Sequence, residues 1–555
     1  MNGFRVKTAT LANNLTSTNL TEKVMEKKQC NKQLDKNHFV NVNPYGTLKP
    51  YKPILVGPDI SKIQTSYTDV DAMFETIRAG NKRHIALFFH GGLVGECSGM
   101  AAAERFYHFY NGVNDVYPVS FIWETGFVSS LIEYVKDAVG DSYFQSIFGD
   151  AASRILSKLG IKVPGITEDE GKPHISFIKT NDFFYIESQQ KILEIETAAA
   201  GYKHLSLEEI EKELLSETNP FEQKAFHLYE MNKNALVSNE GFLGINNVIW
   251  AGIKVAARCI YRFARKRDHG IKGTVLEETY RQIKVGNFVS VEKTAIGIWD
   301  QMKQQAASMW KSNDHKKGDD QFAGRYFWDK LSEYTKEVQK QGGNVVIELV
   351  AHSAGAIAIC ELFDMLKKNN NLYGHITFNN VLFMAPAVKC DLFYETVMPM
   401  KNRYNRFRMF TMHMDFERKD ILIDEKYLHW VYPLSLLYLV SGLCEDGDKW
   451  FDEDVKGDTC LLGLDQHICG KSPYTEYEIM EEIHNFLFEN GEYKNRIALV
   501  PSAKEAPIGY RGKAEDHGFF DNDGDDREEK NTISDSIRES ITHLFKEIEI
   551  DTNVL

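Results

Sequence analysis

Short, almost uninterrupted runs of apolar residues recur in two parts of the chain. Strands whose two faces are both covered by helices have this pattern, whereas strands with one face in water alternate apolar and polar residues. The runs lie at 84–89, 117–123, 344–350, 381–384, 407–412 and 496–500. We therefore predict a mostly parallel sheet built from these segments.

Segments with helical periodicity lie between several of these runs. A helix is predicted at 100–111 after the first run, at 321–341 before the third run and at 354–368 after it. Strands that alternate with helices in this way form a doubly wound domain. The pattern therefore predicts an α/β fold with helices on both faces of the sheet.

The alternation stops between 127 and 319, where the pattern is mostly helical. A segment of this length cannot be a connecting loop in a compact domain, so we interpret 127–319 as a helical cap insertion. Joining 51–126 to 320–555 leaves enough chain for one α/β domain. Residues 1–50 are polar and rich in Asn, Lys and Thr, and we predict that they form a poorly ordered N-terminal extension.

The composition narrows the class of protein. The chain has 555 residues, of which 43% are hydrophobic and 26% charged, as in a globular protein with a large core. A formal net charge of −14 argues against nucleic acid as a partner. The first residues lack the apolar segment of a signal peptide, and no charge-free apolar run reaches the roughly 18 residues of a spanning helix. We therefore expect a cytoplasmic protein whose eight scattered cysteines are reduced.

A possible nucleophile lies where the third predicted strand meets its helix. The apolar strand runs directly into Ser353, and an apolar helix follows at once. A turn this sharp lifts the serine hydroxyl above the edge of the sheet and requires small neighbours, here Ala351 and Gly355. The helix N-terminus also directs N–H groups, including that of Ala354, toward the place where an oxyanion would develop.

The segment 351–355 resembles the nucleophile elbow of the α/β-hydrolase superfamily, G-x-S-x-G, with alanine in place of the first glycine. The resemblance implies an α/β-hydrolase fold and acyl transfer through a serine nucleophile. It also implies an oxyanion element in the segment His90-Gly91-Gly92-Leu93, which follows the first predicted strand. The implied donors are the N–H groups of Gly91, Gly92, Leu93 and Ala354.

In the superfamily the acid and then the base follow the serine, each on a loop after a later strand. His517 follows the last predicted strand and precedes a helix that starts near 532, so we favour it as the base. His467 is the alternative, but no final strand precedes it. We expect His352, next to the serine, to pack against the elbow or orient it.

Three carboxylates follow the predicted strand at 407–412 and are candidates for the acid, which must accept the N–H of the far imidazole nitrogen. They are Asp415, Glu417 and Asp420. Superfamily acids usually lie a few residues past the strand, so we rank Asp420 first and Asp415 second, and the choice stays open.

Lys254, Arg258, Arg262 and Lys266 are spaced by four residues and would form one basic stripe on a helix of the insertion. Such a stripe suits contact with an anionic membrane surface or an acidic partner. The alternative is a cap helix that packs on the core and keeps its basic face in water. The resemblance implies a lid role for an insertion of this kind.

These features predict a serine hydrolase that cleaves a carboxylic ester, with lipids and phospholipids among the candidate substrates. No cofactor is expected. We interpret the acidic run at 521–526 as a solvated loop near the base, because it lacks the spacing of a calcium loop. No His/Cys cluster indicates zinc, so no metal is expected. An amidase, peptidase or acyltransferase with the same triad, or a non-catalytic domain whose insertion binds a protein, are the alternatives. The oligomeric state is left open.

Overall fold

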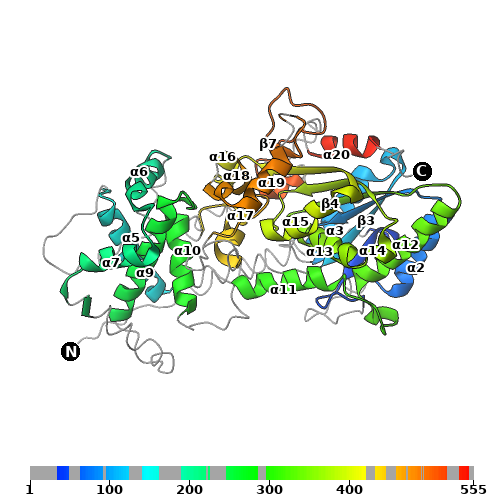
Figure 1. The fold of residues 1–555 in the computed structure, drawn as a ribbon. Coiled ribbons are helices and arrows are strands. Elements are labelled where there is room, and N and C mark those ends of the chain that lie inside the picture. Colours follow the sequence, from blue (N-terminus) through cyan, green and yellow to red (C-terminus); the bar gives the residue numbers. More distant parts are fainter. Residues whose placement is uncertain are drawn as a thin grey trace, which may run out of the picture.

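A seven-stranded parallel sheet, in the order β1-β3-β2-β4-β5-β6-β7, lies in the right half of the molecule as drawn in Figure 1. Its strands are β1 (Phe39–Val42), β2 (His84–Phe89), β3 (Val116–Trp123), β4 (Val346–His352), β5 (Phe378–Met384), β6 (Tyr404–Met412) and β7 (Ile497–Val500). The computed structural model describes residues 34–48, 63–91, 96–123, 141–161, 189–220, 223–224, 245–285, 295–420, 432–445, 458–470, 473–488, 491, 493–521 and 537–548.

All six predicted strands lie in this sheet, which confirms the predicted α/β fold. The sequence prediction missed β1. Residues 1–50 were assigned to a poorly ordered extension, but Phe39, Val40 and Val42 are buried, and β1 pairs with β3 at the edge of the sheet. The expectation is therefore wrong for this part of the segment, because Asn41 interrupts the apolar residues of β1 and the neighbouring sequence is polar.

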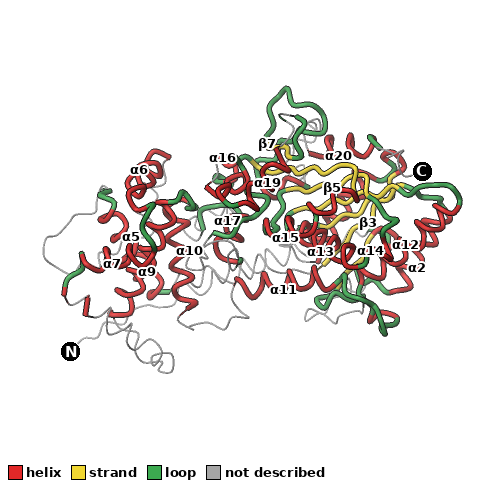
Figure 2. The backbone as a smooth tube through the Cα atoms, viewed as in Figure 1, coloured by secondary structure: helices red, strands yellow, loops and turns green. Residues whose placement is uncertain are grey.

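Helices cover both faces of the sheet (Figure 2). On one face α3 (Glu96–Tyr110) and α20 (Ile537–Lys546) pack in the same apolar cluster as Phe88, Val350 and Phe410 of the sheet. The opposite face packs on α2 (Tyr67–Ala79), α11 (Ala295–Ser308), α12 (Ala323–Lys340), α13 (Gly355–Lys368), α15 (Cys390–Thr396) and α19 (Glu478–Phe488). Each strand therefore buries both of its faces, which explains its continuous apolar sequence.

The shorter elements lie in the connections. They are η1 (Lys36–His38), η3 (Val113–Asp115), η5 (Ala200–Tyr202), η7 (Gly318–Asp320), α14 (Asn370–Tyr373), η8 (Met398–Arg403), α16 (Met414–Glu417), α17 (Leu436–Leu439), η9 (Val440–Cys444), α18 (Asp465–Ile468), η10 (Pro473–Glu476) and η11 (His517–Phe520). The apolar segment from 434 to 443 is buried throughout and contains α17 and most of η9.

A group of helices lies beside the sheet, at the left in Figure 1. It contains α5 (Ser142–Lys158), α6 (Gln189–Ala199), α7 (Leu207–Ser216), α9 (Ile245–Ala264) and α10 (Gly270–Val285). The next helix, α11, lies under the sheet instead: Gln305 donates to the carbonyl of Val42, and Trp310 donates to the carbonyl of Ala358. The structure thus places α11 with the α/β domain, although the sequence prediction included it in the insertion.

The predicted basic stripe is not a solvent-facing surface. Arg262 is completely buried and binds Glu277 and Glu278, at 2.8 and 3.0 Å. Lys254 pairs with Glu211, and Arg258 donates to Gln282. Lys266 is exposed, but it follows the end of α9 in a left-handed conformation. The four-residue spacing correctly predicted that Lys254, Arg258 and Arg262 lie on one face of α9. That face packs against other helices of the insertion, so it offers no continuous basic surface to a membrane.

Two further expectations can be compared with the structure. Six described cysteines are free, but Cys97 is disulfide-bonded, so the expectation that all thiols are reduced is wrong at that position. Its pairing depends on tertiary proximity, which the spacing of cysteines along the chain cannot reveal. None of the helices in the described part of the chain has the length and apolar character needed to cross a membrane.

Candidate active site

Ser353 lies at a strained turn between β4 and α13. Its φ is 51°, in the left-handed region that non-glycine residues rarely adopt. The turn is held by hydrogen bonds: the Ser353 N–H donates to the carbonyl of Met384 at 2.8 Å, and the Ser353 carbonyl accepts from Ala387 at 3.0 Å. The tight packing explains Gly355, because a Cβ there would lie 2.0 Å from the carbonyl oxygen of Phe89.

The serine lies where the strand order reverses, between β2 and β4. Ligands of open α/β sheets bind at such points, outside the carboxyl ends of the strands. Gly91 follows β2 there, and a Cβ on it would lie 3.2 Å from the Cβ of Ser353. Within the described residues, the N–H of Ala354 donates no hydrogen bond, so it is free to meet an oxyanion. Gly92 and Leu93, the other expected donors, lie outside the described residues.

His517 is brought to the serine from the far end of the chain. Its Nε2 lies 2.9 Å from the Oγ of Ser353, and both side chains are buried. It begins η11, and Asp516 caps this short helix by accepting the N–H of Gly518. Burial, together with the nearby charge of His352, lowers the pKa of His517 to about 3. The imidazole is therefore neutral near pH 7 and can accept the hydroxyl proton.

The three candidate acids have different positions. Asp420 is close to the base: its Oδ2 accepts the backbone N–H of His517 at 3.0 Å. Asp415 is about half exposed and lies 3.9 Å from the ring of His413. Glu417 is buried against Ser435, and burial raises its pKa to about 8. Only Asp420 of these three contacts the loop that carries the base.

Among the described residues, no carboxylate accepts from the second nitrogen of the His517 imidazole. Its Nδ1 is buried and has no hydrogen-bond partner among the residues that the structure describes. Burial raises the pKa of Asp420 to about 6, Asp516 adds to the rise, and the hydrogen bond from the His517 N–H opposes it. The structure therefore shows the carboxylate at the main chain of the base and not at its ring.

Two residues near the site were not predicted. Asp521 accepts from Nδ1 of His352, with 3.2 Å between the atoms, and Arg105 binds the other oxygen of Asp521 at 3.3 Å. The sequence analysis treated 521–526 as a solvated acidic loop. That interpretation is wrong for Asp521, which is largely buried, while 522–526 lie outside the described residues. No local signal marks Asp521, because its partner Arg105 is far away in the sequence.

His467, the alternative base, lies in a different cluster and has no contact with Ser353 among its hydrogen bonds. It is completely buried with His269 and Asp458, and one ligand atom from each lies within 4.8 Å of the others. These three residues are the set that could hold a metal ion in the described part of the chain. A metal would bind Nε2 of both histidines and an oxygen of Asp458.

The hydrogen bonds of this cluster fit an ionic network better than a metal site. The N–H of Leu461 donates to Nδ1 of His467 at 2.9 Å, so the proton of the neutral ring lies on Nε2 and points at Asp458. The second oxygen of Asp458 accepts from Arg267 and Tyr474. Asp458 is thus surrounded by donors without any ion.

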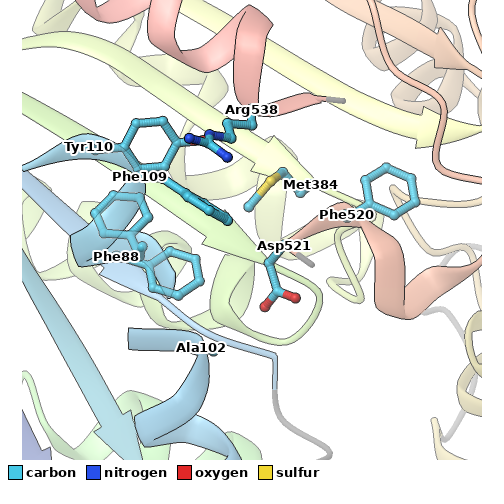
Figure 3. Close-up of a pocket in the computed structure, with 9 residues that line it drawn as sticks. Phe88, Ala102, Phe109, Tyr110, Met384, Phe520, Asp521 and Arg538 are labelled. Carbon is cyan, nitrogen blue, oxygen red and sulfur yellow. The ribbon is translucent and has the colours of Figure 1, made fainter. Parts of the chain in front are cut away.

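A small apolar cavity lies beside Asp521 on the α3 and α20 face of the sheet (Figure 3). Its volume is about 20 Å³, which is room for about one water molecule. It is lined by Phe88, Ala102, Phe106, Phe109, Tyr110, Met384, Phe520, Asp521 and Arg538.

The parallel sheet and the serine in a strained strand-to-helix turn are those of an α/β-hydrolase fold. Residues 307–416 match the model of a family described as an alpha/beta hydrolase of unknown function (DUF900). The matched segment contains α12, β4, α13, β5, β6 and Ser353, but neither Asp420 nor His517. Searches of curated proteins and of solved structures gave no match.

Proposed function

We propose that this protein is a serine hydrolase that cleaves a carboxylic ester, with Ser353 as the nucleophile and His517 as the general base. The observation that carries the proposal is the 2.9 Å contact between Ser353 Oγ and His517 Nε2, made by a serine whose φ is 51°. A buried hydroxyl next to a neutral imidazole is the arrangement that activates a serine. The match to a hydrolase family supports the reaction class.

In the proposed mechanism His517 Nε2 takes the hydroxyl proton as Ser353 Oγ attacks the ester carbonyl. The oxyanion is stabilised by the N–H of Ala354 and by N–H groups of Gly91, Gly92 and Leu93, aided by the N-terminal end of the α13 dipole. The alcohol leaves with the proton of His517. Water, activated by the same ring, then hydrolyses the acyl-enzyme and regenerates the serine.

Asp420 is the acid that we propose for the triad. Its carboxylate already accepts the main-chain N–H of His517, and a rotation of its side chain toward Nδ1 would let it stabilise the imidazolium. The empty hydrogen-bonding position at Nδ1 is the one that this rotation would fill. Lipids and phospholipids remain our candidate esters, and a cytoplasmic location remains our expectation.

The proposal is tested by labelling with a fluorophosphonate probe, which reacts with activated serines. Wild-type protein should be labelled, and Ser353→Ala should lose at least about 99% of the label because the attacking oxygen is gone. Ser157→Ala, which changes an exposed serine on α5, should be labelled like the wild type. Folded wild-type protein that takes up no label would contradict the proposal and favour a non-catalytic hydrolase-like domain.

A further inference from the structure

The main chain of His517 is held by side chains on both sides. Its N–H donates to Asp420 Oδ2 at 3.0 Å, and its carbonyl oxygen lies 3.1 Å from Nε2 of His352. The His517 ring itself makes one hydrogen bond in the described structure, to Ser353 Oγ, since Nδ1 has no partner there. The contacts of its peptide groups therefore fix where the imidazole lies.

The ring of His352 is fixed in turn from its other side. Nδ1 faces Asp521 Oδ2 at 3.2 Å, and Arg105 binds both the carboxylate and the carbonyl of Asp521. Burial works against ionisation of Asp521, but His352 and Arg105 outweigh it and hold its pKa below the usual range. A carboxylate and a carbonyl can only accept, so each nitrogen of His352 faces an acceptor.

His352 also packs in a row of rings. Its centroid lies 5.2 Å from that of His517, at an interplanar angle of 33°, and 6.3 Å from that of Phe520, at 18°. The side chain of His352 is only 8% exposed. Four interactions on different sides thus leave the ring little freedom to turn. Because β4 ends at His352 and Ser353 follows directly, one strand end fixes the nucleophile and the loop of the base.

We propose that His352 is a positioning residue for the reaction, which holds the carbonyl of His517 through Nε2 and so keeps the imidazole in reach of Ser353 Oγ. The proposal rests on the proposed roles of Ser353 and His517. Displacement of a catalytic group by about 1 Å can lower the rate about a hundredfold. Loss of the contact between His352 Nε2 and the His517 carbonyl should therefore slow the reaction measurably. Asp521 and Arg105 support the reaction indirectly, through the orientation of His352.

Two amide variants separate the two nitrogens of the ring. In His352→Gln the amide nitrogen lies near the former Nε2 and can still donate to the His517 carbonyl. In His352→Asn it lies near the former Nδ1 and can donate only to Asp521. We expect the maximal rate of fluorophosphonate labelling to fall about tenfold to a hundredfold in His352→Asn. In His352→Gln, which keeps the donor to the His517 carbonyl but loses the contact with Asp521, it should fall only about threefold to fivefold. The probe concentration that gives half the maximal rate should change by less than about twofold in both.

The labelling rates of the two variants should differ because each variant keeps a different contact of the His352 ring. Unfolding temperatures are measured for both variants, so that a loss of rate caused by lower stability is recognised. Equal losses that follow the unfolding temperature would overturn the proposal, and so would a wild-type rate in His352→Asn. If the wild type itself is not labelled, the proposed function fails and the role of His352 fails with it.

A variant outside β4 keeps the proposal testable if His352→Asn does not fold. Asp521→Asn weakens the hold on Nδ1 without changing the strand. Its maximal labelling rate should fall several-fold, with the half-maximal probe concentration again unchanged. A wild-type rate in folded Asp521→Asn would show that the ring needs no support from Asp521 and would overturn the proposal.

Discussion

Individual residues of the site differ in how far their charge state is set by their surroundings. Asp420, which burial and Asp516 shift to a pKa of about 6, is the group that titrates closest to neutral pH beside the base. His517 has a pKa of about 3, so it stays neutral over the range in which Asp420 loses its charge. The pH dependence of the reaction should therefore report the carboxylate.

We expect the labelling rate of the wild type to fall as the pH drops through about 6, because protonated Asp420 can no longer stabilise the imidazolium. In Asp420→Asn this dependence should disappear and the rate should be low throughout, by about a factor of ten or more. Asp415→Asn, which changes an exposed carboxylate, serves as the control and should keep the wild-type profile. A profile unchanged by Asp420→Asn would rule out this residue as the acid.

The sequence identified some residues of the site and not others. Chain order and the strand-to-helix pattern selected Ser353 and His517, which the structure brings together. They also selected Asp420, which the structure places at the main chain of the base. Asp521 was missed because its burial depends on Arg105 and His352, and an acidic run looks solvated until the folded partners are known.

Secondary-structure elements were predicted well where their sequence pattern was long enough. The six recognised strands contain nearly continuous apolar runs, whereas Asn41 interrupts the four residues of β1, which pairs with β3 at the edge of the sheet. The helix α11 was recognised as helical but assigned to the insertion. Periodicity reports which face of a helix is apolar, and it does not reveal which neighbour covers that face.

At the junction of β4 and α13 the two elements approach β2 so closely that only glycine fits. We expect Gly355→Ala to destabilise the fold by about 2–3 kcal/mol, since the new Cβ would overlap the carbonyl of Phe89. Thermal unfolding measures the loss, and labelling of Ser353 should fall with it. Gly201→Ala is the matched control, because a Cβ there meets nothing within 4 Å. Equal stability of the two variants would contradict the tight approach.

In the molecule as a whole, a buried ionic network joins the helical insertion to the α/β domain. From the insertion come Arg262, Arg267, His269 and Glu277, and from the segment before α18 comes Asp458. His269 lies between Glu277 Oε1 at 2.9 Å and Asp458 Oδ1 at 3.2 Å. Burial opposes its charge, but the two carboxylates prevail and raise the pKa of His269.

A pKa raised by folding makes stability depend on pH in a known direction. The contribution of His269 is fully present below its unfolded pKa of about 6.5 and is lost as the pH rises through the higher folded value. We expect the unfolding temperature to fall on the alkaline side, and to fall less in His269→Gln. His413→Gln, at a half-exposed histidine, is the control and should follow the wild type. Identical pH dependence in all three proteins would contradict the network's role.

The network has a consequence for how a substrate would enter. Asp458 and His467 belong to the same segment as Leu462 and Gly463. The N–H of Leu462 donates to the carbonyl of Val388, and Gly463 lies against Pro386. Ala387, between Pro386 and Val388, donates its N–H to the Ser353 carbonyl. A segment that opens as a gate must break its contacts at a small free-energy cost. Separation of these charges would leave buried ions without counter-ions, which costs about 3–5 kcal/mol for a single broken pair. Helices α9 and α10 are therefore held firmly to the segment before α18, and their movement away from it as a gate would be costly.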